Sequence, residues 1–414
     1  MMEKSEGPNS LMEEKFQKFD KGLKEAIYEF ERWSPELVYL IHHDDADGLT
    51  SAAIAKRALE REKIKTRLIC IEKLYPDIVK RLHALSGNVY FYLDIAAAHA
   101  KFISEENKGK NLTFILDHHD AEPSTDPLVY NLDPELYGIS GERDVSGSAT
   151  AYVLSRRLNP RNIDVSHLAV IGSAEIPGDL RGINRMVLED AVKKELVRVV
   201  VSTGKESYRI TPFKGRSSRS LSRRLTVLGS VGYYRGGPKM GVDACLKGFT
   251  SETEAFTDEL EEERKKANKR LLAQLYHGGL LKSSNVQWFH ARDVFKGMGV
   301  KVVGSFCSLI SYKTLVDGNK YIFGFMNMDR EIPGFGMLEE DYVKVSARVP
   351  PKLGKLIMSG KKPPLSKILA EACRESGGNA DGHAVAASGW IPRGQKETLV
   401  RKANDIISKQ LSEE

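Results

Sequence analysis

Histidines and aspartates gather in one short stretch of the sequence. Residues 38–52 read VYLIHHDDADGLTSA, an apolar run followed by two imidazoles, three carboxylates and a glycine. These polar groups would repel one another and resist burial if left alone, and a bound cation relieves that cost. The apolar run is typical of a buried parallel strand, and open α/β sheets bind ligands at the carboxyl ends of such strands. The stretch therefore predicts part of a metal site.

Two more apolar runs end in the same kind of side chain. The run YFYL precedes Asp94, and the run FIL precedes the sequence Asp117-His118-His119. A lone aspartate at a strand end often caps the next helix. Three such clusters in one array instead favour a common sheet edge where carboxylates and imidazoles converge, as a hydrolase with two metal ions requires.

The elements that must position these residues follow a regular pattern. Strands are predicted at residues 37–42, 66–71, 89–93 and 112–116. Helices are predicted at residues 49–62, 75–85, 97–106, 147–157 and 164–175. Strands that alternate with helices of this length imply a parallel sheet with right-handed connections. Ahead of this array, residues 11–33 have the apolar spacing of an amphipathic helix, which we expect to pack on the same domain.

These motifs resemble the DHH phosphoesterase superfamily. The resemblance is carried by the sequence HDDADG at 43–48, by Asp94 and by the sequence DHH at 117–119. A second signature, GGNADGH at 377–383, runs on through AASG at 386–389. Together with SAR at 346–348, it is similar to the DHH-associated C-terminal domain of the nucleases in that superfamily. The resemblance covers most of residues 35–395, and the overall pattern is similar to the archaeal RecJ-like single-strand exonucleases.

The resemblance implies a set of metal ligands. His43, Asp45 and Asp94 would hold one metal ion. Asp47, Asp94 and His118 would hold the second, so that Asp94 bridges the two ions.

The resemblance also implies roles for neighbouring residues. His119 would lie near the scissile phosphate, where it could stabilise developing negative charge. Asp117 would orient the histidine pair, as carboxylates behind ligating imidazoles do. His42 and Asp44 alternate with the ligands, so at a strand end they should point to the opposite face, and they are interpreted as non-ligands.

The family pattern includes one more carboxylate for the second metal ion. The segment 169–180, AVIGSAEIPGDL, lies at the expected place, but Ile176 occupies the usual position of the aspartate. Asp179 is our choice for this ligand, and Glu175 is the rival. If neither coordinates, the second metal ion would be weakly held.

The expected fold is α/β. A parallel-sheet DHH domain is joined by a long helix to a smaller α/β C-terminal domain, with an active-site cleft between them. The predicted parts are an N-terminal helix at 1–34, the catalytic domain at 35–250, the linker helix at 251–278 and the nucleic-acid-binding domain at 279–414.

The C-terminal domain is expected to contact the substrate. Its strands are predicted near residues 286–290, 300–303, 321–326 and 342–348, followed by a helix at 365–376. Arg348 could bind a phosphate bidentately. The glycine-rich turn with Gly377, Gly378 and His383 could bind phosphate through backbone N–H groups.

The catalytic domain also carries a basic segment at 205–245. Within it, residues 214–224, KGRSSRSLSRR, are equally consistent with a contact for a phosphate backbone and with a solvated loop. The run GYYRGGP at 232–238 could stack bases on its tyrosines, although such glycine-rich runs more often form tight turns.

Composition restricts the classes of protein that remain. No apolar run approaches the roughly 18 residues that span a membrane, so no membrane partner is expected. The polar N-terminus does not resemble a secretory signal. The four cysteines are scattered without a C-x-x-C pair, which argues against a zinc knot or a disulfide framework and favours a reducing, cytoplasmic setting. The net charge of +6 permits a nucleic-acid partner without requiring one.

The leading hypothesis is a metal-dependent exonuclease. It would hydrolyse single-stranded DNA or RNA to nucleoside monophosphates by a two-metal mechanism, in DNA repair, replication or RNA turnover. Carboxylates with a few imidazoles suit Mn²⁺, with Mg²⁺ as the alternative.

Two other functions stay open. One is a phosphodiesterase for short oligonucleotides or cyclic dinucleotides. The other is a replisome-associated scaffold with weak or no nuclease activity, although an active nuclease could also bind a GINS-like replication complex or a DNA helicase. A family II pyrophosphatase fits less well, because Arg348 and the C-terminal glycine motif are of the nuclease type.

Overall fold

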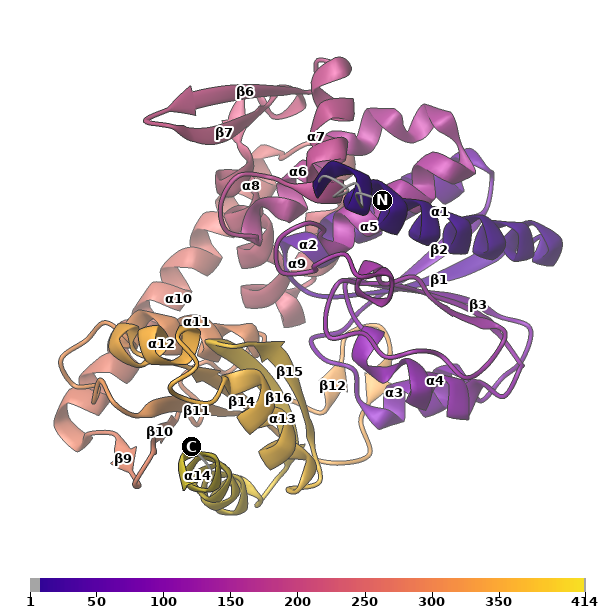
Figure 1. Cartoon of the computed structure of the whole chain (residues 1–414). Coiled ribbons are helices and arrows are strands. Elements are labelled where there is room, and N and C mark those ends of the chain that lie inside the picture. The colour runs from indigo at the N-terminus through magenta and orange to yellow at the C-terminus, as the bar shows by residue number, and fades with distance from the viewer. Residues whose placement is uncertain (1–7, 413–414) are drawn as a thin grey trace, which may run out of the picture. The chain divides into compact units, whose positions relative to one another are not determined.

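The protein divides into two compact units. The computed structural model describes residues 8–412, with side chains from residue 12 to residue 410 (Figure 1). The first unit extends to Gly229 and includes Gly236–Ala255, and the second comprises Ser230–Arg235 and the chain from Phe256 onward. The division falls inside α10 (Ser251–Gly278), the long helix that the sequence predicts. The finer domain boundaries given above remain predictions.

The first unit is built on a parallel sheet of five strands in the order β2-β1-β3-β4-β5. Its strands are β1 (Leu37–His42), β2 (Lys65–Cys70), β3 (Val89–Leu93), β4 (Leu112–Leu116) and β5 (Val129–Asn131). The α/β prediction and the first four strands are confirmed. Sequence analysis missed β5, because a strand of three residues is too short for an apolar pattern.

Helices cover both faces of this sheet. In Figure 1, α1, α2 and α5 lie on one face, and α3 and α4 lie on the other. The helices of this unit are α1 (Pro8–Trp33), α2 (Ala46–Arg61), α3 (Pro76–Leu82), α4 (Ala100–Asn107), α5 (Gly147–Leu158), α6 (Ser166–Gly172), α7 (Gly182–Lys193), α8 (Ser218–Thr226) and α9 (Gly237–Lys247). Small side chains such as Ala52 and Ala53 make α2 buried along most of its length, so that α5 and α6 can approach it closely.

The register of the sheet brings three strand ends to one level. His42 of β1 is paired with Leu93 of β3, and Leu93 is paired with Leu116 of β4. In a sheet of this order the connections leave in opposite directions between β1 and β3, which is where such folds bind ligands. The polar clusters predicted from the sequence therefore begin side by side at this switch point.

A small antiparallel sheet is inserted after α7. It consists of β6 (Val197–Ser202), β7 (Lys205–Ile210) and β8 (Arg216–Ser217). Residues 214–224 are not a solvated loop, because β8 and the first turns of α8 occupy most of that run. Leu221 and Leu225 are buried at the helical spacing that anchors α8. The phosphate contact, the other interpretation of this run, remains a prediction.

The second unit contains a mixed sheet of six strands in the order β15-β16-β14-β11-β10-β9. The strands are β9 (Leu281–Lys282), β10 (Val286–His290), β11 (Tyr321–Asn327), β14 (Tyr342–Arg348), β15 (Asn379–His383) and β16 (Ala386–Pro392), with a separate hairpin of β12 (Glu331–Ile332) and β13 (Gly336–Met337). Besides α10, its helices are α11 (Lys301–Ile310), α12 (Pro351–Met358), α13 (Leu365–Arg374) and α14 (Lys396–Ser412).

One predicted strand of the second unit is wrong. Residues 300–303 begin α11 instead of a strand. The short apolar run is ambiguous in period, and the continuation through Phe306 and Ile310 buries one face of a helix. Between residues 8 and 412, no helix has the length and apolar character needed to cross a membrane.

The packing of α1 predicts that shortening one of its buried side chains will strongly lower the stability of the protein. Phe19 is fully buried and packs edge to face on Tyr137 with ring centroids 5.4 Å apart. The Phe19→Ala variant should lower the free energy of unfolding by about 3–5 kcal/mol through lost burial and cavity formation. Urea unfolding followed by circular dichroism measures this change. Tyr28→Ala on the same helix is the control, because Tyr28 is 66% exposed, and an equal loss there would contradict the assignment of the buried face.

Buried His83 predicts a pH dependence of stability. Its ring contacts Asn107 Oδ1 at 2.9 Å and the Tyr92 hydroxyl at 3.1 Å, and burial lowers the pKa of His83 from 6.5 to about 4. Between these two pH values the unfolded chain binds a proton at His83 and the folded protein does not. The contribution of neutral His83 to stability is therefore present above pH 6.5 and is lost as the pH falls toward 4. The free energy of unfolding is measured with urea at several pH values between 4 and 6.5. Its slope against pH should be shallower for His83→Gln than for the parent protein. Identical slopes would contradict the prediction.

Candidate metal centre

The first part of the site lies between β1 and α2. Asp45 is the N-cap of α2, and its Oδ1 accepts a hydrogen bond from the backbone N–H of Gly48 at 3.0 Å. His43 faces this carboxylate, with 2.9 Å between His43 Nδ1 and Asp45 Oδ2. Glycine is required at position 48, because a Cβ there would lie 2.7 Å from the Cβ of His43. The tight turn thus holds two polar side chains at the strand end.

Asp94 follows β3 in a strained and buried position. Its backbone is left-handed, with φ at 58°, a conformation that concentrates at functional sites when the residue is not glycine. Asp94 is only 4% exposed, and its Oδ1 has no hydrogen-bond donor among the described residues. Burial, followed by the charges of Asp47 and Asp45, raises the pKa of Asp94 well above its usual value. A cation beside this oxygen would supply the missing partner.

Asp117 organises the end of β4. Its Oδ1 accepts hydrogen bonds from the backbone N–H of His118 and from the His119 ring, both at 2.8 Å. Its Oδ2 accepts a third from the backbone N–H of Ala97 at 2.9 Å. Although burial opposes the shift, the charge of His119 lowers the pKa of Asp117. Burial and the charge of His118 lower the pKa of His119. The charge and hydrogen bond of Asp117 raise it, and the net result is a pKa of about 9 for His119.

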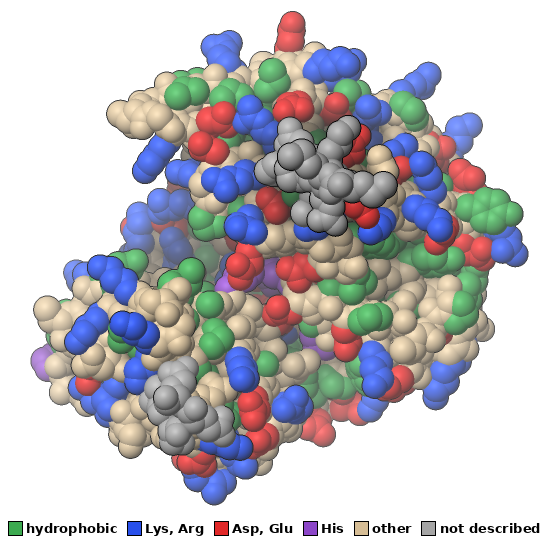
Figure 2. All heavy atoms as spheres, viewed as in Figure 1, with side chains coloured by type: hydrophobic (Ala, Val, Ile, Leu, Met, Phe, Trp, Pro, Cys, Tyr) green, Lys and Arg blue, Asp and Glu red, His purple; other side chains and the backbone are tan. Residues whose placement is uncertain are grey.

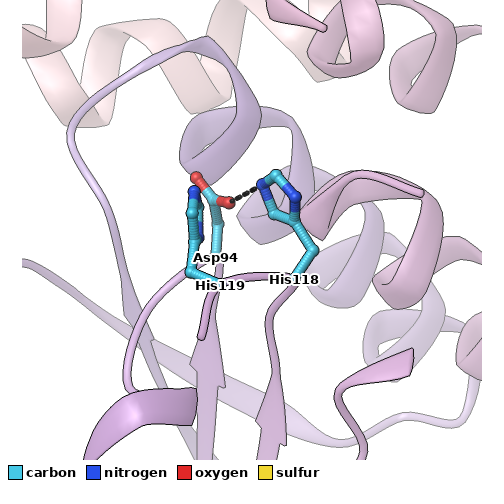
Figure 3. Close-up of side chains that lie close together, drawn as sticks. All are labelled: Asp94, His118 and His119. Carbon is cyan, nitrogen blue, oxygen red and sulfur yellow. Dashed lines mark ion pairs between the residues drawn. The ribbon is translucent and has the colours of Figure 1, made fainter. Parts of the chain in front are cut away.

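His118 points one ring nitrogen at the carboxylates. Its Nδ1 lies 2.9 Å from the carbonyl oxygen of Gly141, so this nitrogen carries the proton in the neutral ring. Its Nε2 is then the free acceptor, 3.4 Å from Asp94 Oδ1 and 3.6 Å from Asp47 Oδ2. Figure 3 shows the His118 ring facing the Asp94 carboxylate, with His119 beside it. A ring held in this tautomer is prepared to bind a metal ion.

Asp47 is held by the start of α5. Its two oxygens accept hydrogen bonds from the backbone N–H groups of Gly147 at 2.9 Å and Ser148 at 2.8 Å. The first turn of a helix favours an anion in this way. Gly147 also faces Asp94, because a Cβ there would lie 2.5 Å from Asp94 Oδ1. Sequence reasoning missed both positions, and the available signal was the run of small residues SGSATA at 146–151.

Among the residues that the structure describes, two groups of side chains could hold a metal ion, and they share Asp94. One group is His43, Asp45 and Asp94, and the other is Asp94, His118 and His119. In each group the candidate ligand atoms lie within 4.8 Å of one another. These residues fit hard or borderline divalent cations, because they offer carboxylate oxygens and imidazole nitrogens without thiolates. His119 thus stands close enough to be a ligand, in addition to its predicted place near the phosphate.

The structure brings neither candidate for the last carboxylate into these two groups. Both Asp179 and Glu175 are exposed. Asp179 Oδ1 accepts a hydrogen bond from the backbone N–H of Glu206 at 3.1 Å. Glu175 Oε1 accepts one from the hydroxyl of Thr226 at 2.9 Å, and that hydroxyl in turn accepts from the backbone N–H of Ala46.

Arg348 and His383 lie in the second unit, at one end of its sheet. In the strand register Ala386 of β16 is paired with Arg348 of β14 on one side and with His383 of β15 on the other. Arg348 is anchored by hydrogen bonds from Nε to the Ser308 hydroxyl at 3.0 Å and from Nη1 to the carbonyl oxygen of Ala347 at 2.8 Å. The predicted glycines, Gly377 and Gly378, immediately precede β15.

The predicted aromatic loop is largely inaccessible. Tyr233 is fully buried and packs edge to face against Tyr234, with ring centroids 4.9 Å apart. Base stacking on Tyr233 is therefore excluded.

His42 is also buried, and burial lowers its pKa to about 4. Among the described residues, His42 and Asp44 belong to neither group of candidate ligands, although Asp44 Oδ1 lies 3.3 Å from His43 Nε2.

The fold and the side-chain groups define an α/β protein with a candidate metal centre at the switch point of a parallel sheet. Residues 37–172 match the model of the DHH family, N-terminal domain. The matched third of the chain contains all five residues of the two groups.

The chain is also similar, over most of its length, to one protein in sequence and to solved structures in fold. It is 21% identical to an uncharacterized protein of Methanocaldococcus jannaschii, with 95% of this chain and 98% of that protein covered. The structure of RecJ from Thermus thermophilus in complex with Mn²⁺ matches with a TM-score of 0.62 and 17% identity, over 94% of this chain. The chain spans 55% of that RecJ. A structure of exonuclease RecJ bound to manganese matches with a TM-score of 0.59 and 17% identity, over 94% of both chains. At these identities the two matches establish the shared fold.

The packing of Gly147 predicts a defect in metal binding. In Gly147→Ala the new methyl group would displace Asp94 and weaken the helix contacts of Asp47. We expect Mn²⁺ affinity to fall about 10- to 100-fold, as it does when groups that orient metal ligands are lost. Isothermal titration calorimetry with Mn²⁺ measures the change without reference to activity. The control is Gly278→Ala, where no atom lies within 4 Å of the added carbon, and unchanged Mn²⁺ affinity in Gly147→Ala would contradict this packing.

Proposed function

We propose that the protein is a metal-dependent exonuclease that hydrolyses single-stranded DNA or RNA to nucleoside monophosphates. The observation that carries the proposal is the sharing of Asp94 between two groups of candidate ligands. A carboxylate between two ion sites suits phosphodiester hydrolysis, in which charge develops on both the attacking and the leaving oxygen. The fold shared with the RecJ exonuclease supports the choice of a nucleic-acid substrate.

The metal ions would be held as the motifs suggest. We assign His43, Asp45 and Asp94 to one ion, and Asp47, Asp94 and His118 to the other. When bound, Mn²⁺ or Mg²⁺ would supply Lewis acidity toward the phosphate and would lower the pKa of water. Two RecJ structures contain Mn²⁺, which makes this ion the first choice.

The protein's own residues have separate tasks. Asp117 holds His119 through its ring nitrogen and favours the charged form of that ring, so the pKa of His119 rises to about 9 despite burial. A protonated imidazole would stabilise negative charge on the phosphate. Asp47, fixed by the start of α5, keeps its carboxylate turned toward His118. These assignments make His119 and Asp117 the catalytic pair.

The last carboxylate of the second ion is the remaining assignment. Asp179 is proposed from the sequence, and Glu175 is supported by its hydrogen bond through Thr226 to the start of α2. The Asp179→Asn and Glu175→Gln variants separate the two residues. The variant that lacks the true ligand should bind one Mn²⁺ tightly and the second weakly, as measured by calorimetry.

Digestion of defined substrates tests the proposed function. Single-stranded DNA and RNA labelled at either end, and a dinucleotide, are incubated with the protein and Mn²⁺. Products of every length are expected, and Asp94→Ala should lower the rate by at least about a hundredfold, because charge stabilisation at the reacting phosphate is lost. Asp405→Ala is the control, since Asp405 is exposed and lies in the second unit.

Each alternative function predicts a different result. Hydrolysis of the dinucleotide alone would identify a phosphodiesterase for short substrates. Failure to hydrolyse any substrate would overturn the proposal and favour a scaffold. A near-normal rate for Asp94→Ala with Mn²⁺ would refute the shared carboxylate while leaving the activity itself in place.

A further inference from the structure

A long stretch of the second unit contains basic residues and no acidic ones. From residue 342 to residue 370 there are seven lysines and arginines without a single aspartate or glutamate. Residues 294–316 carry three lysines, again without an acidic residue. In a chain whose overall charge is only +6, this segregation gathers basic residues on the elements that these stretches form.

These two stretches meet around Arg348. The Ser308 hydroxyl of α11 accepts a hydrogen bond from Arg348 Nε, and α12 begins three residues after Arg348. The loop after α11 returns to α12, because a Cβ at Gly318 would lie 3.9 Å from the side chain of Lys352. We define the α11–α12 face by the following residues of these elements and the loops after them: Leu309, Tyr312, Lys313, Lys352, Lys355, Met358, Lys361 and Lys362.

The lysines of the α11–α12 face have no acidic partners. Among the described residues, no carboxylate lies within ion-pair distance of Lys313, Lys352, Lys355, Lys361 or Lys362. On α10, in contrast, Lys265 is paired with Glu262 at 2.7 Å. In Figure 2, Lys and Arg side chains gather around the region where Figure 1 labels α11 and α12. A face of unpaired ammonium groups is open to an external anion.

Large apolar side chains are exposed among these lysines. Tyr312 is 79% exposed, Met358 is 75% exposed and Leu309 is 40% exposed. Surfaces that bind single strands combine ammonium groups for the phosphates with aromatic side chains for the bases. An acidic protein surface would satisfy the lysines but would leave the aromatic ring without a comparable partner.

We propose that the α11–α12 face binds the sugar–phosphate backbone of single-stranded nucleic acid, with Tyr312 stacking on a base. The inference rests on the proposed nuclease function and specifies its substrate class. Lys352 and Lys355 are one helical turn apart and follow directly from Arg348, so they extend its positive charge along α12. The face therefore favours strands of several nucleotides over dinucleotides.

Binding without divalent metal tests the face separately from catalysis. Fluorescence anisotropy of labelled oligo-dT and oligo-U, each of about 20 nucleotides, is measured in EDTA at salt concentrations from about 50 to 200 mM. The double variant Lys352→Glu/Lys355→Glu should bind at least tenfold more weakly than the parent at the lowest salt. Its slope of log affinity against log salt should be smaller by about 1.4, because each lost phosphate contact on a single strand removes about 0.7.

Two further variants guard against trivial explanations. Lys193→Glu/Lys194→Glu on and after α7 makes the same charge change beside Glu189, Asp190 and Glu195, and it should bind like the parent. Lys361→Glu/Lys362→Glu lies in the turn after α12, where misfolding of the helix is not a concern, and it should also lose affinity. Tyr312→Ala should weaken binding without changing the salt slope.

The outcomes distinguish this proposal from the proposed function. If Lys352→Glu/Lys355→Glu and Lys361→Glu/Lys362→Glu bind oligonucleotides as tightly as the parent, the α11–α12 face is not a binding surface, even if Mn²⁺-dependent hydrolysis is observed. In another outcome, the protein hydrolyses no substrate while the variants still lose binding. That result would support the α11–α12 face as a binding surface and would contradict the proposed nuclease activity. Binding to phosphatidylserine vesicles but not to oligonucleotides would overturn the proposal in favour of a membrane surface. In an active enzyme, Lys352→Glu/Lys355→Glu should lower the ratio of kcat/KM on long strands to kcat/KM on a dinucleotide by at least tenfold.

Discussion

Three parallel strands that end at one level impose the main constraint on the first unit. Because His42, Leu93 and Leu116 lie side by side, the polar residues after them are brought together and withdrawn from water. Asp94 bears most of the cost, since burial and neighbouring carboxylates raise its pKa well above the usual value. A divalent cation would offset that cost by replacing repulsion with coordination. The candidate metal centre is therefore a consequence of sheet register combined with the motifs.

The helices around the sheet orient the site as well as covering the core. Small side chains let α5 approach α2 closely, and the start of α5 then reaches Asp47 with two backbone N–H groups. Gly147 permits this approach because no side chain separates α5 from Asp94. Substitutions that leave every candidate ligand intact can thus disturb the site through packing.

The two units differ in the charged groups that they gather, and both fit the proposed polyanionic substrate. The first unit concentrates carboxylates at the candidate metal centre, which a phosphate could approach once metal ions are bound there. The second unit exposes lysines without acidic partners around a largely buried arginine, and these can bind phosphates directly. Carboxylates thus gather where chemistry on a phosphate is proposed, and ammonium groups gather where binding of the strand is proposed.

The sequence alone determined the α/β class, the first four parallel strands, the long helix α10 and the polar motifs, because apolar runs and the groups that follow them are local features. It failed at β5 and at residues 300–303, where short runs fit more than one structure, and it left the structure of 214–224 open. Only the tertiary structure decided that Gly147 and Ser148 hold Asp47 and that His119 joins Asp94 and His118 in one group of candidate ligands. The tertiary structure also kept Asp179 and Glu175 out of both groups. Such contacts join residues far apart in the chain, and they depend on sheet register and helix packing, which no local pattern encodes.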